Sequence, residues 1–253
     1  MLCSKAVYNL YHREDNMNKL QNTHFWNEAW DKYFDHYQQD PRHAYYINAF
    51  LNDDEQKILE IAAGSFRDFN ILNSVGKNCF AFDYCKNAVN KAKKMFPNLQ
   101  NKISLQNAFA TTYQDKEFDF TYHNGFWVCF NNKQILQLAK EQIRITKKRF
   151  AFTVHNGHNQ KFVQYFDTLK QHDTLYDIRF FTLNDIYHII TALKMEMENV
   201  KIYPVGKYKK YLEDELILSG KTDAASIRNC IEEQKLNNLF TSERLLCIVQ
   251  IPE

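Results

Sequence analysis

Short apolar runs alternate with helical segments along most of this sequence. Runs with β-strand character occur seven times, at residues 57–61, 78–83, 102–105, 117–122, 149–154, 200–203 and 245–251. Segments with helical character lie between many of them, at residues 67–74, 87–96, 133–145 and from Thr182 onwards. Parallel strands need a crossover connection, usually a helix, so this alternation favours a largely parallel sheet. The chain is therefore predicted to be an α/β protein.

The sequence divides into an extension, a helical cap and a main domain. Residues 1–20 are polar and aperiodic, which is typical of a loose extension. Residues 21–51 carry aromatic side chains at helical spacing, interrupted by Asp40-Pro41, and are predicted to form a cap of two helices. Residues 52–253 form the main domain. Its polar, partly helical stretch 206–241 is an insertion that the alternation does not require, of the kind that often lines a substrate site or an interface.

Composition narrows the range of partners. With 253 residues, of which 45% are hydrophobic, the chain is long enough for one sizeable core. The net charge is 32 − 30 = +2, too small to make nucleic acid or an anionic membrane the expected partner. No apolar run approaches the ~18 residues that span a bilayer, and no signal peptide is recognisable, so a cytoplasmic protein without membrane insertion is expected. The six cysteines include no Cys-x-x-Cys pair, which indicates neither disulfides nor a cysteine zinc site.

Residues 57–69 carry the pattern with the clearest chemical meaning. An apolar run ends at Glu60, a turn of small residues follows at 62–65, and a helix begins after it. Small side chains allow a cofactor to approach the backbone, and the helix N-terminus offers free N–H groups. A second acid, Asp83, ends the next run 83 − 60 = 23 residues later, where it can accept hydrogen bonds from ribose hydroxyls. The pattern indicates a nucleotide-type cofactor site, with Tyr84 placed to pack on an adenine ring.

Residues 59–68 resemble the first motif of the class I S-adenosylmethionine-dependent methyltransferases, an acid-x-Gly-x-Gly-x-Gly stretch followed by Arg-Asp. The resemblance extends to residues 82–84, 103–109, 118–125 and 180–185, and spans roughly residues 25–251. It implies a Rossmann-like fold, with a mostly parallel seven-stranded sheet, helices on both faces and S-adenosylmethionine as the cofactor. More weakly, the whole chain is similar to bacterial methyltransferases that modify surface polysaccharides, which implies O-methylation of a sugar or a phosphoramidate-type capsule precursor.

The sequence departs from the family pattern at three positions. Ala62 stands where the family usually has its first glycine, and Phe66 where it often has its third. Ala108 replaces the acid that commonly receives the adenine amino group, so adenine recognition is expected to pass to the backbone of Ala108 and Phe109. We expect these changes to affect cofactor affinity rather than the fold.

The resemblance implies a set of cofactor contacts. They come from the loops that follow the first four strands, at Glu60, Ala62, Gly64, Asp83, Tyr84, Asn107, Ala108, Phe109 and Asn124. From the cap, Tyr37 or Arg42 is expected to reach the methionine carboxylate. Trp127 is expected to face the sulfonium by cation–π attraction.

Polar clusters directly after two strands are candidates for the acceptor site, because ligands of parallel α/β sheets lie beyond the carboxyl ends of the strands. They are residues 122–124 and 155–159. His155 is the first candidate for a general base or acceptor-orienting group and His123 the second, while hydrogen bonding of either histidine to a loop carbonyl remains an equal alternative. Asn156 and His158 are expected to contact the acceptor. No carboxylate neighbours these histidines in sequence, so no metal site is predicted.

These patterns together predict an S-adenosylmethionine-dependent methyltransferase that acts on a small-molecule acceptor, as a monomer or homodimer. Two alternatives stay open. The first is an NAD(P)-dependent oxidoreductase, although its Gly-x-Gly-x-x-Gly turn is missing and Glu60 would repel a pyrophosphate. The second is a non-catalytic relative that serves as an interaction module.

Overall fold

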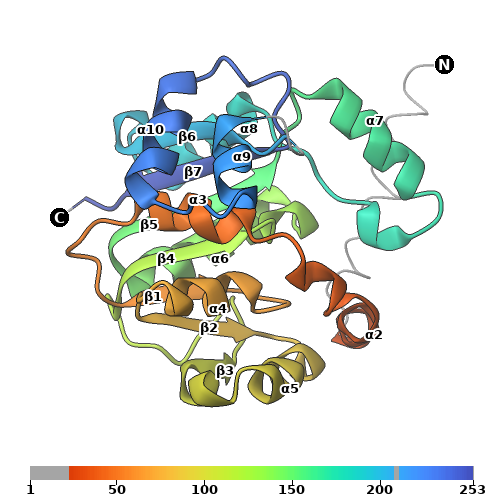
Figure 1. The fold of residues 1–253 in the computed structure, drawn as a ribbon, viewed down its shortest axis with the longest axis vertical. Coiled ribbons are helices and arrows are strands. Elements are labelled where there is room, and N and C mark those ends of the chain that lie inside the picture. Colours follow the sequence, from red (N-terminus) through yellow and green to blue (C-terminus); the bar gives the residue numbers. More distant parts are fainter. Residues whose placement is uncertain (1–22, 208–210, 253) are drawn as a thin grey trace.

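A single sheet organises the molecule (Figure 1). The computed structural model describes residues 23–207 and 211–252, and within them seven strands pair in the order β3-β2-β1-β4-β5-β7-β6. The strands are β1 (Ile58–Ile61), β2 (Cys79–Asp83), β3 (Ile103–Leu105), β4 (Phe118–Asn124), β5 (Thr146–His155), β6 (Val200–Val205) and β7 (Arg244–Gln250). The pairs along β3-β2-β1-β4-β5 are parallel, and β7 runs antiparallel to both β5 and β6. The predicted mostly parallel, seven-stranded sheet is confirmed.

The strand order reverses at β1. The chain runs outward from β1 through β2 to β3, then returns to β4 on the other side of β1. In open α/β sheets the crevice at such a switch point, beyond the carboxyl ends of the strands, is where ligands bind. The antiparallel β7 begins at this same edge, because its first residue, Arg244, pairs with the last residue of β5, His155.

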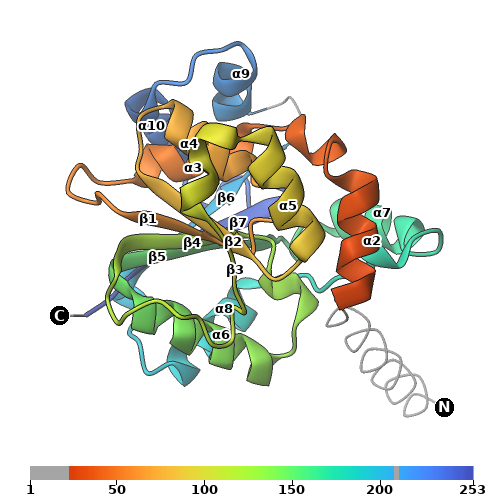
Figure 2. The ribbon, with the colours of Figure 1, turned by 90° about the horizontal axis from the view of Figure 1, so that it is seen from below.

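Helices cover both faces of the sheet, as Figure 2 shows. One face carries α3 (Arg42–Phe50), α4 (Arg67–Ser74), α5 (Lys86–Met95) and α10 (Ala224–Gln234); the other carries α6 (Asn132–Ile145) and α8 (Leu183–Ala192). The apolar stripes of these helices are buried against apolar strand residues. Phe69 and Ile227 lie in one layer of the core, and Ile135 and Ile186 lie in the other. Both faces of the sheet are thereby removed from water, which explains why its strands read as nearly continuous apolar runs.

Two helices lie at the carboxyl ends of the strands, and the first of them packs against α5, where Lys91 pairs with Asp31 at 3.3 Å. They are α2 (Thr23–Tyr33) and α7 (Gln160–Leu169), which both lie on the right-hand side of the molecule in Figures 1 and 2. The Tyr33 hydroxyl of α2 donates a hydrogen bond to Asp173, just before η4 (Thr174–Tyr176), and Lys32 lies 3.8 Å from the same carboxylate. Neither helix contains a fully buried residue. They form a lightly packed cover over the edge where ligands bind.

The predicted cap and the predicted insertion each contribute a helix to the core of the molecule. Of the predicted cap, α2 is peripheral, whereas α3 is buried on the sheet at every position except Tyr45. The segment predicted as an insertion holds α9 (Leu212–Leu218) and α10, and Ile227 and Ile231 of α10 pack in the same core layer as α3 and β6. The α7 helix is not anticipated by the sequence pattern. The predicted extension at residues 1–20 lies outside the described residues.

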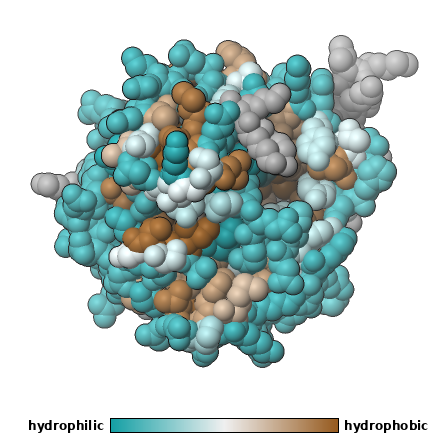
Figure 3. Space-filling view, in the orientation of Figure 1, coloured by the Kyte–Doolittle hydropathy of each residue, from teal (hydrophilic) through white to brown (hydrophobic). Residues whose placement is uncertain are grey.

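The surface over α3 and α4 is mainly hydrophilic, and its hydrophobic groups are separated from one another (Figure 3). In the described part of the chain, no helix is long and apolar enough to cross a membrane. Residues 23–207 and 211–252 also contain no group of three or more His, Cys, Asp or Glu side chains that could hold a metal ion.

Candidate active site

The turn after β1 has a left-handed backbone at three positions. Ala62 has φ 53°, Gly64 has φ 57° and Phe66 has φ 55°. An L-residue with a side chain is disfavoured in this region, whereas glycine adopts it freely. Ala62 and Phe66 are the two positions where the related family usually has glycine, so this chain keeps the shape of the turn although two side chains oppose it.

Asp83 joins the turns that follow β1 and β2. Its Oδ2 accepts a hydrogen bond from the N–H of Gly64 at 2.8 Å, and its Oδ1 accepts one from the N–H of Cys85 at 2.7 Å. The residue is only 7% exposed, and burial raises the pKa of its carboxyl to about 6, against the effect of these N–H donors. A carboxylate offers about four lone-pair sites. Asp83 therefore holds the turn in place and keeps acceptor capacity for ribose hydroxyls.

Glu60 points into the protein rather than toward a ligand. Its Oε2 accepts a hydrogen bond from the backbone N–H of Phe69, in the first turn of α4, at 2.8 Å. Burial, with a smaller contribution from Asp68, raises the pKa of Glu60 well above its usual value. The side chain fastens α4 to β1, and the structure does not bring it to the cofactor side of the turn.

A buried ionic network lies behind the same turn. Asp68 is paired with Arg67 at 2.7 Å and with the Nδ1 atom of His43 at 2.6 Å, and Nε2 of His43 lies 2.7 Å from the Thr153 hydroxyl. Burial alone would raise the pKa of Asp68, but Arg67 and His43 lower it to about 2. Asn124, at the end of β4, directs its amide to Asp68 at 3.5 Å. The network fixes Asn124 beside the switch point, where the sequence predicts a cofactor contact.

The indole of Trp30 lies on Gly64. A Cβ atom at Gly64 would be only 2.2 Å from Cζ2 of Trp30, so the position needs glycine for space as well as for its backbone angle. Trp30 also packs edge-on against Tyr37, with ring centroids 5.5 Å apart, and Gln38 donates to the Ser65 carbonyl at 2.8 Å. The α2–η1 segment thus covers the outer side of the turn. The sequence pattern placed Trp30 in the helical cap at residues 21–51 and gave no signal for its contact with Gly64.

The two cap residues predicted to hold the methionine carboxylate lie in different surroundings. Tyr37 is partly exposed, and its carbonyl accepts a hydrogen bond from Arg67 at 3.1 Å. Arg42 is buried and makes a two-pronged contact with Asp40, at 2.9 and 2.7 Å, with Asp214 3.6 Å away. The charge of Arg42 is therefore already balanced by acids, whereas Tyr37 remains beside the cofactor turn.

The residues expected around the adenine follow the adjacent strands β2 and β3. Tyr84 is 52% exposed and Phe109 is 36% exposed, so both aromatic rings are accessible. Asn107 is exposed as well, and its side chain accepts a hydrogen bond from the backbone N–H of Phe109 at 3.0 Å. Ala108 is buried and lines a small pocket. The N–H of Phe109 is thus already engaged, while the exposed rings of Tyr84 and Phe109 are available for packing.

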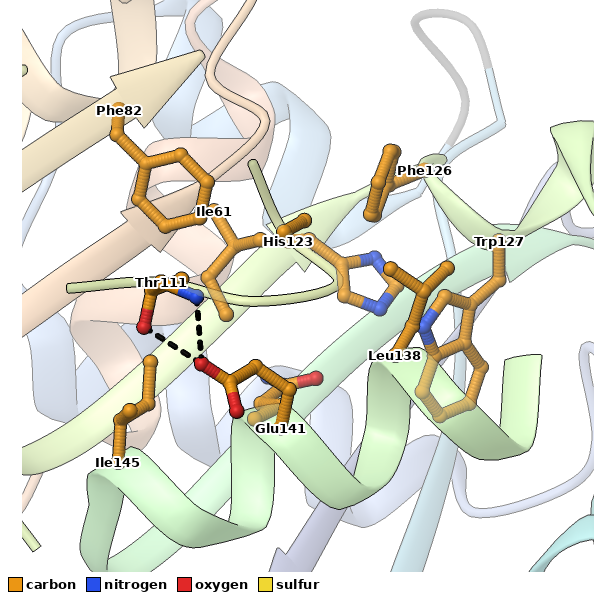
Figure 4. A pocket seen from close by; sticks show the side chains of 11 residues that line it. Ile61, Phe82, Thr111, His123, Phe126, Trp127, Leu138, Glu141 and Ile145 are labelled. Atoms are coloured by element: carbon orange, nitrogen blue, oxygen red, sulfur yellow. Dashed lines mark hydrogen bonds between the residues drawn. The ribbon is translucent and has the colours of Figure 1, made fainter. Parts of the chain in front are cut away.

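That small pocket lies between β4 and α6 and contains His123 and Trp127 (Figure 4). His123 is 1% exposed, both of its ring nitrogens lack a hydrogen-bond partner, and its ring centroid lies 4.9 Å from that of Trp127. Burial, helped by His43, lowers the pKa of His123 to about 3. Both side chains are buried on the α6 face of the sheet, so the structure does not bring them to the edge where a base or a sulfonium contact would act.

His155, the last residue of β5, lies at the ligand edge. Its Nε2 atom accepts a hydrogen bond from the guanidinium of Arg244. The rings of Phe162, Phe166 and Phe180 surround it, with centroids 5.9, 5.2 and 5.5 Å away. Burial, and then Arg244, lower the pKa of His155 well below its usual value, so the imidazole is neutral. Sequence reasoning missed Arg244, although an antiparallel last strand places its first residue at this edge.

Asn156 and His158, predicted to contact the acceptor, are used in internal contacts. The amide of Asn156 is fully buried, donates to the Leu239 carbonyl at 2.6 Å and accepts from the N–H of His158 at 2.9 Å. Nε2 of His158 accepts a hydrogen bond from the N–H of Leu183, in the first turn of α8, at 3.0 Å. These side chains anchor the loop after β5 to α8 and to the end of the 206–241 segment.

Comparisons with known protein families and solved structures find methyltransferases. Residues 59–152 match the family model described as a methyltransferase domain. Among solved structures, a SAM-dependent methyltransferase from Archaeoglobus fulgidus is similar, with a TM-score of 0.55 and 14% identity over 90% of this chain and 98% of that one. The YcgJ protein from Bacillus subtilis gives 0.54 and 17% over 83% and 99%. The plantazolicin methyltransferase BamL, solved with a triazolic desmethylPZN analogue and SAH, gives 0.60 and 15% over 96% and 98%. None of the curated proteins matches this sequence.

The strand order and the helices on both faces define the fold of the class I methyltransferases. Residues 59–152, which match the methyltransferase-domain model, contain the β1–α4 turn, Asp83 and the end of β4. The Rossmann-like fold expected from the sequence is thereby confirmed.

Proposed function

We propose that this protein is an S-adenosylmethionine-dependent methyltransferase that acts on a small-molecule acceptor. The observation that carries the proposal is the link between Asp83 and Gly64, which holds a small-residue turn and a ribose-binding carboxylate together at the switch point of the sheet. The similarity to BamL, solved with SAH, supports the choice of cofactor. The low net charge and the α2–α7 cover favour a small molecule over a nucleic acid.

The cofactor, when bound, supplies a methyl group on a sulfonium, which is displaced in line by the acceptor. The chain has to hold both molecules in alignment and exclude water. Asp83 is placed to accept hydrogen bonds from ribose hydroxyls, and the exposed rings of Tyr84 and Phe109 offer apolar faces to an adenine. The α2 and α7 helices lie where they shield the site from solvent (Figure 2).

His155 fits a positioning role better than a basic one. Its Nε2 atom is engaged by Arg244, and its lowered pKa makes the imidazole a weak base. An acceptor that needs no proton removed is therefore the better match to this site.

Calorimetric titration of S-adenosylhomocysteine tests the proposal, with NAD⁺ and NADP⁺ as competing ligands. We expect wild type to bind S-adenosylhomocysteine, and Asp83→Asn to bind at least ~10-fold more weakly because a charged hydrogen-bond acceptor is lost. If the cofactor needs the ionised carboxylate, a pKa of about 6 predicts that wild-type affinity falls about tenfold between pH 7.5 and pH 5.

The control is Asp53→Asn, which changes an exposed acid shortly before β1, at the opposite end of the strands. It should bind like wild type and keep the pH dependence, whereas Asp83→Asn should lose that dependence. Folded wild-type protein that binds NAD⁺ or no ligand at all would overturn the methyltransferase proposal.

A further inference from the structure

Arg244 carries a charge that has no ion-pair partner among the described residues. A guanidinium has five N–H donors, and one of them is used on Nε2 of His155. Among residues 23–207 and 211–252, no other hydrogen bond and no ion pair of Arg244 is found. The side chain is half-buried, so the remaining donors stay open to an acceptor that enters from outside.

The acids that act electrostatically on Arg244 are also in contact with a second cation, Arg42. Glu243 and Asp40 both act on Arg244, yet Asp40 makes its hydrogen bonds with Arg42, and Glu243 lies 3.8 Å from Arg42. Burial lowers the pKa of Arg244, which means that its charge is held in an environment poorer in water than the surface. A charged group in such a place gains most from an anionic partner.

The surroundings of Arg244 fit an organic body attached to that anion. His155, which binds the guanidinium, is enclosed by Phe162, Phe166 and Phe180. Nδ1 of His155 is buried and has no hydrogen-bond partner. The aromatic side chains thus lie next to the N–H donors of a guanidinium. Such a site is suited to a ligand that has an apolar body and an anionic group at one end.

The position distinguishes this group from a cofactor contact. Arg244 starts β7, which is three strands away from β1 in the order β1-β4-β5-β7. At ~4.8 Å per strand this corresponds to about 14 Å across the sheet from the small-residue turn. The backbone of Arg244 therefore lies on the side of the edge away from that turn, and its guanidinium extends into the electrostatic range of Tyr37.

We propose that Arg244 binds a carboxylate or phosphate group of the methyl acceptor. Its guanidinium is held by His155, and the side chains of Phe162, Phe166 and Phe180 surround that histidine. The inference rests on the proposed function, because it assigns the acceptor side of that same site. The substrate class is an anion with an apolar or aromatic body. A neutral His155 suits this class, since a carboxylate or phosphate oxygen needs no base to become nucleophilic.

Calorimetric titration of small probes tests the inference. Phenyl phosphate and benzoate represent the two anions, benzyl alcohol is the neutral analogue, and each is added to protein saturated with S-adenosylhomocysteine. We expect at least one anion to bind wild type at least ~10-fold more tightly than benzyl alcohol, and the tighter anion to identify the acceptor group. Arg244→Gln should weaken that anion at least ~10-fold, and Arg244→Lys by less. Lys161→Gln, which removes an exposed charge from α7, should bind within twofold of wild type.

Three results would overturn the inference: equal binding of anions and benzyl alcohol, unchanged binding in folded Arg244→Gln, or displacement of the anion by S-adenosylhomocysteine. The last result would assign Arg244 to the cofactor carboxylate. Anion binding is also measured without cofactor, so failure of S-adenosylhomocysteine to bind would count against the proposed function alone.

A second measurement uses only wild type and does not depend on the folding of a variant. The histidine Cε1–H resonances are followed by NMR while the tighter anion is added. One buried histidine should shift with the calorimetric affinity, because His155 contacts the guanidinium. Absence of such a shift would contradict the inference.

Discussion

At the scale of single residues, Ala62 shows how this chain keeps a left-handed backbone without glycine at that position. Its φ of 53° places a side chain in the left-handed region, which disfavours an L-residue by roughly 1–2 kcal/mol. Ala62→Gly should therefore raise the free energy of unfolding by about 1 kcal/mol, even after the greater freedom of glycine in the unfolded chain is counted. Urea denaturation at neutral pH measures the change.

The neighbouring Ala63 is a matched control, because its φ is not positive and it is buried. Ala63→Gly should lower the free energy of unfolding by about 1 kcal/mol. If both glycine variants were destabilised alike, backbone strain at position 62 would not be the cause. Phe66, at φ 55°, does not lend itself to the same test because its ring is part of the core.

The acids of the motif show what residue-level reasoning could and could not reach. The spacing between Glu60 and Asp83 correctly indicated two acids at the ends of neighbouring parallel strands. The spacing did not show which side of the turn between β1 and α4 each of the two carboxyl groups faces. Asp83 bonds to the Gly64 turn, whereas Glu60 bonds to the N–H of Phe69 behind it. That difference arises from the path of the helix after the turn, which no periodic pattern encodes.

At the scale of elements, we expect α2 to adjust when a cofactor binds. Trp30 covers Gly64, and the helix has no fully buried residue, although Lys91 of α5 pairs with its Asp31. Trp30→Ala should therefore increase the association rate of S-adenosylhomocysteine by about threefold or more, because a binding-competent site is populated more often. Surface plasmon resonance with immobilised protein measures the rate.

Glu28→Ala is the control for α2, since this side chain is exposed on the same helix. Its association rate should equal that of wild type. An unchanged rate in Trp30→Ala would mean that the indole does not obstruct the entry of the cofactor.

The elements themselves were largely predictable, and the exceptions have physical reasons. Helices such as α4, at Arg67–Ser74, were anticipated because one face is apolar and packs on the sheet. The α7 helix was not, because its aromatic residues Phe162 and Phe166 pack around a single histidine rather than on a layer. Asn156 was predicted to be a ligand contact because it follows a strand, but its partners come from residues 239–242, far away in the sequence.

At the scale of the whole molecule, the strand–helix alternation predicted a largely parallel sheet, since parallel strands and crossover helices constrain one another. The seven-stranded, mostly parallel arrangement came from the resemblance to the methyltransferases. Long-range polar pairings were not predictable in the same way. The contact of Arg244 with His155 joins residues 89 positions apart through the antiparallel pairing of β5 with β7. Such a pair follows from the register of the finished sheet rather than from either local sequence.

The stability of the whole fold should fall in acid, and His123 is one identifiable cause. Its pKa is about 3 in the folded protein and near 6.5 when exposed, so the unfolded chain binds a proton first as the pH drops. The stability that depends on a neutral His123 is complete above pH 6.5 and is lost as the pH falls toward 3. At pH 4.5, two units below the pKa of an exposed histidine, the free energy of unfolding is therefore lower by two times 1.36 kcal/mol, or about 3 kcal/mol.

The variant His123→Leu should remove this loss of stability, and urea denaturation at pH 7 and pH 4.5 measures the difference. His172→Leu changes an exposed histidine and should leave the acid sensitivity as in wild type. An equal loss of stability in His123→Leu and wild type would show that the buried imidazole does not set this dependence.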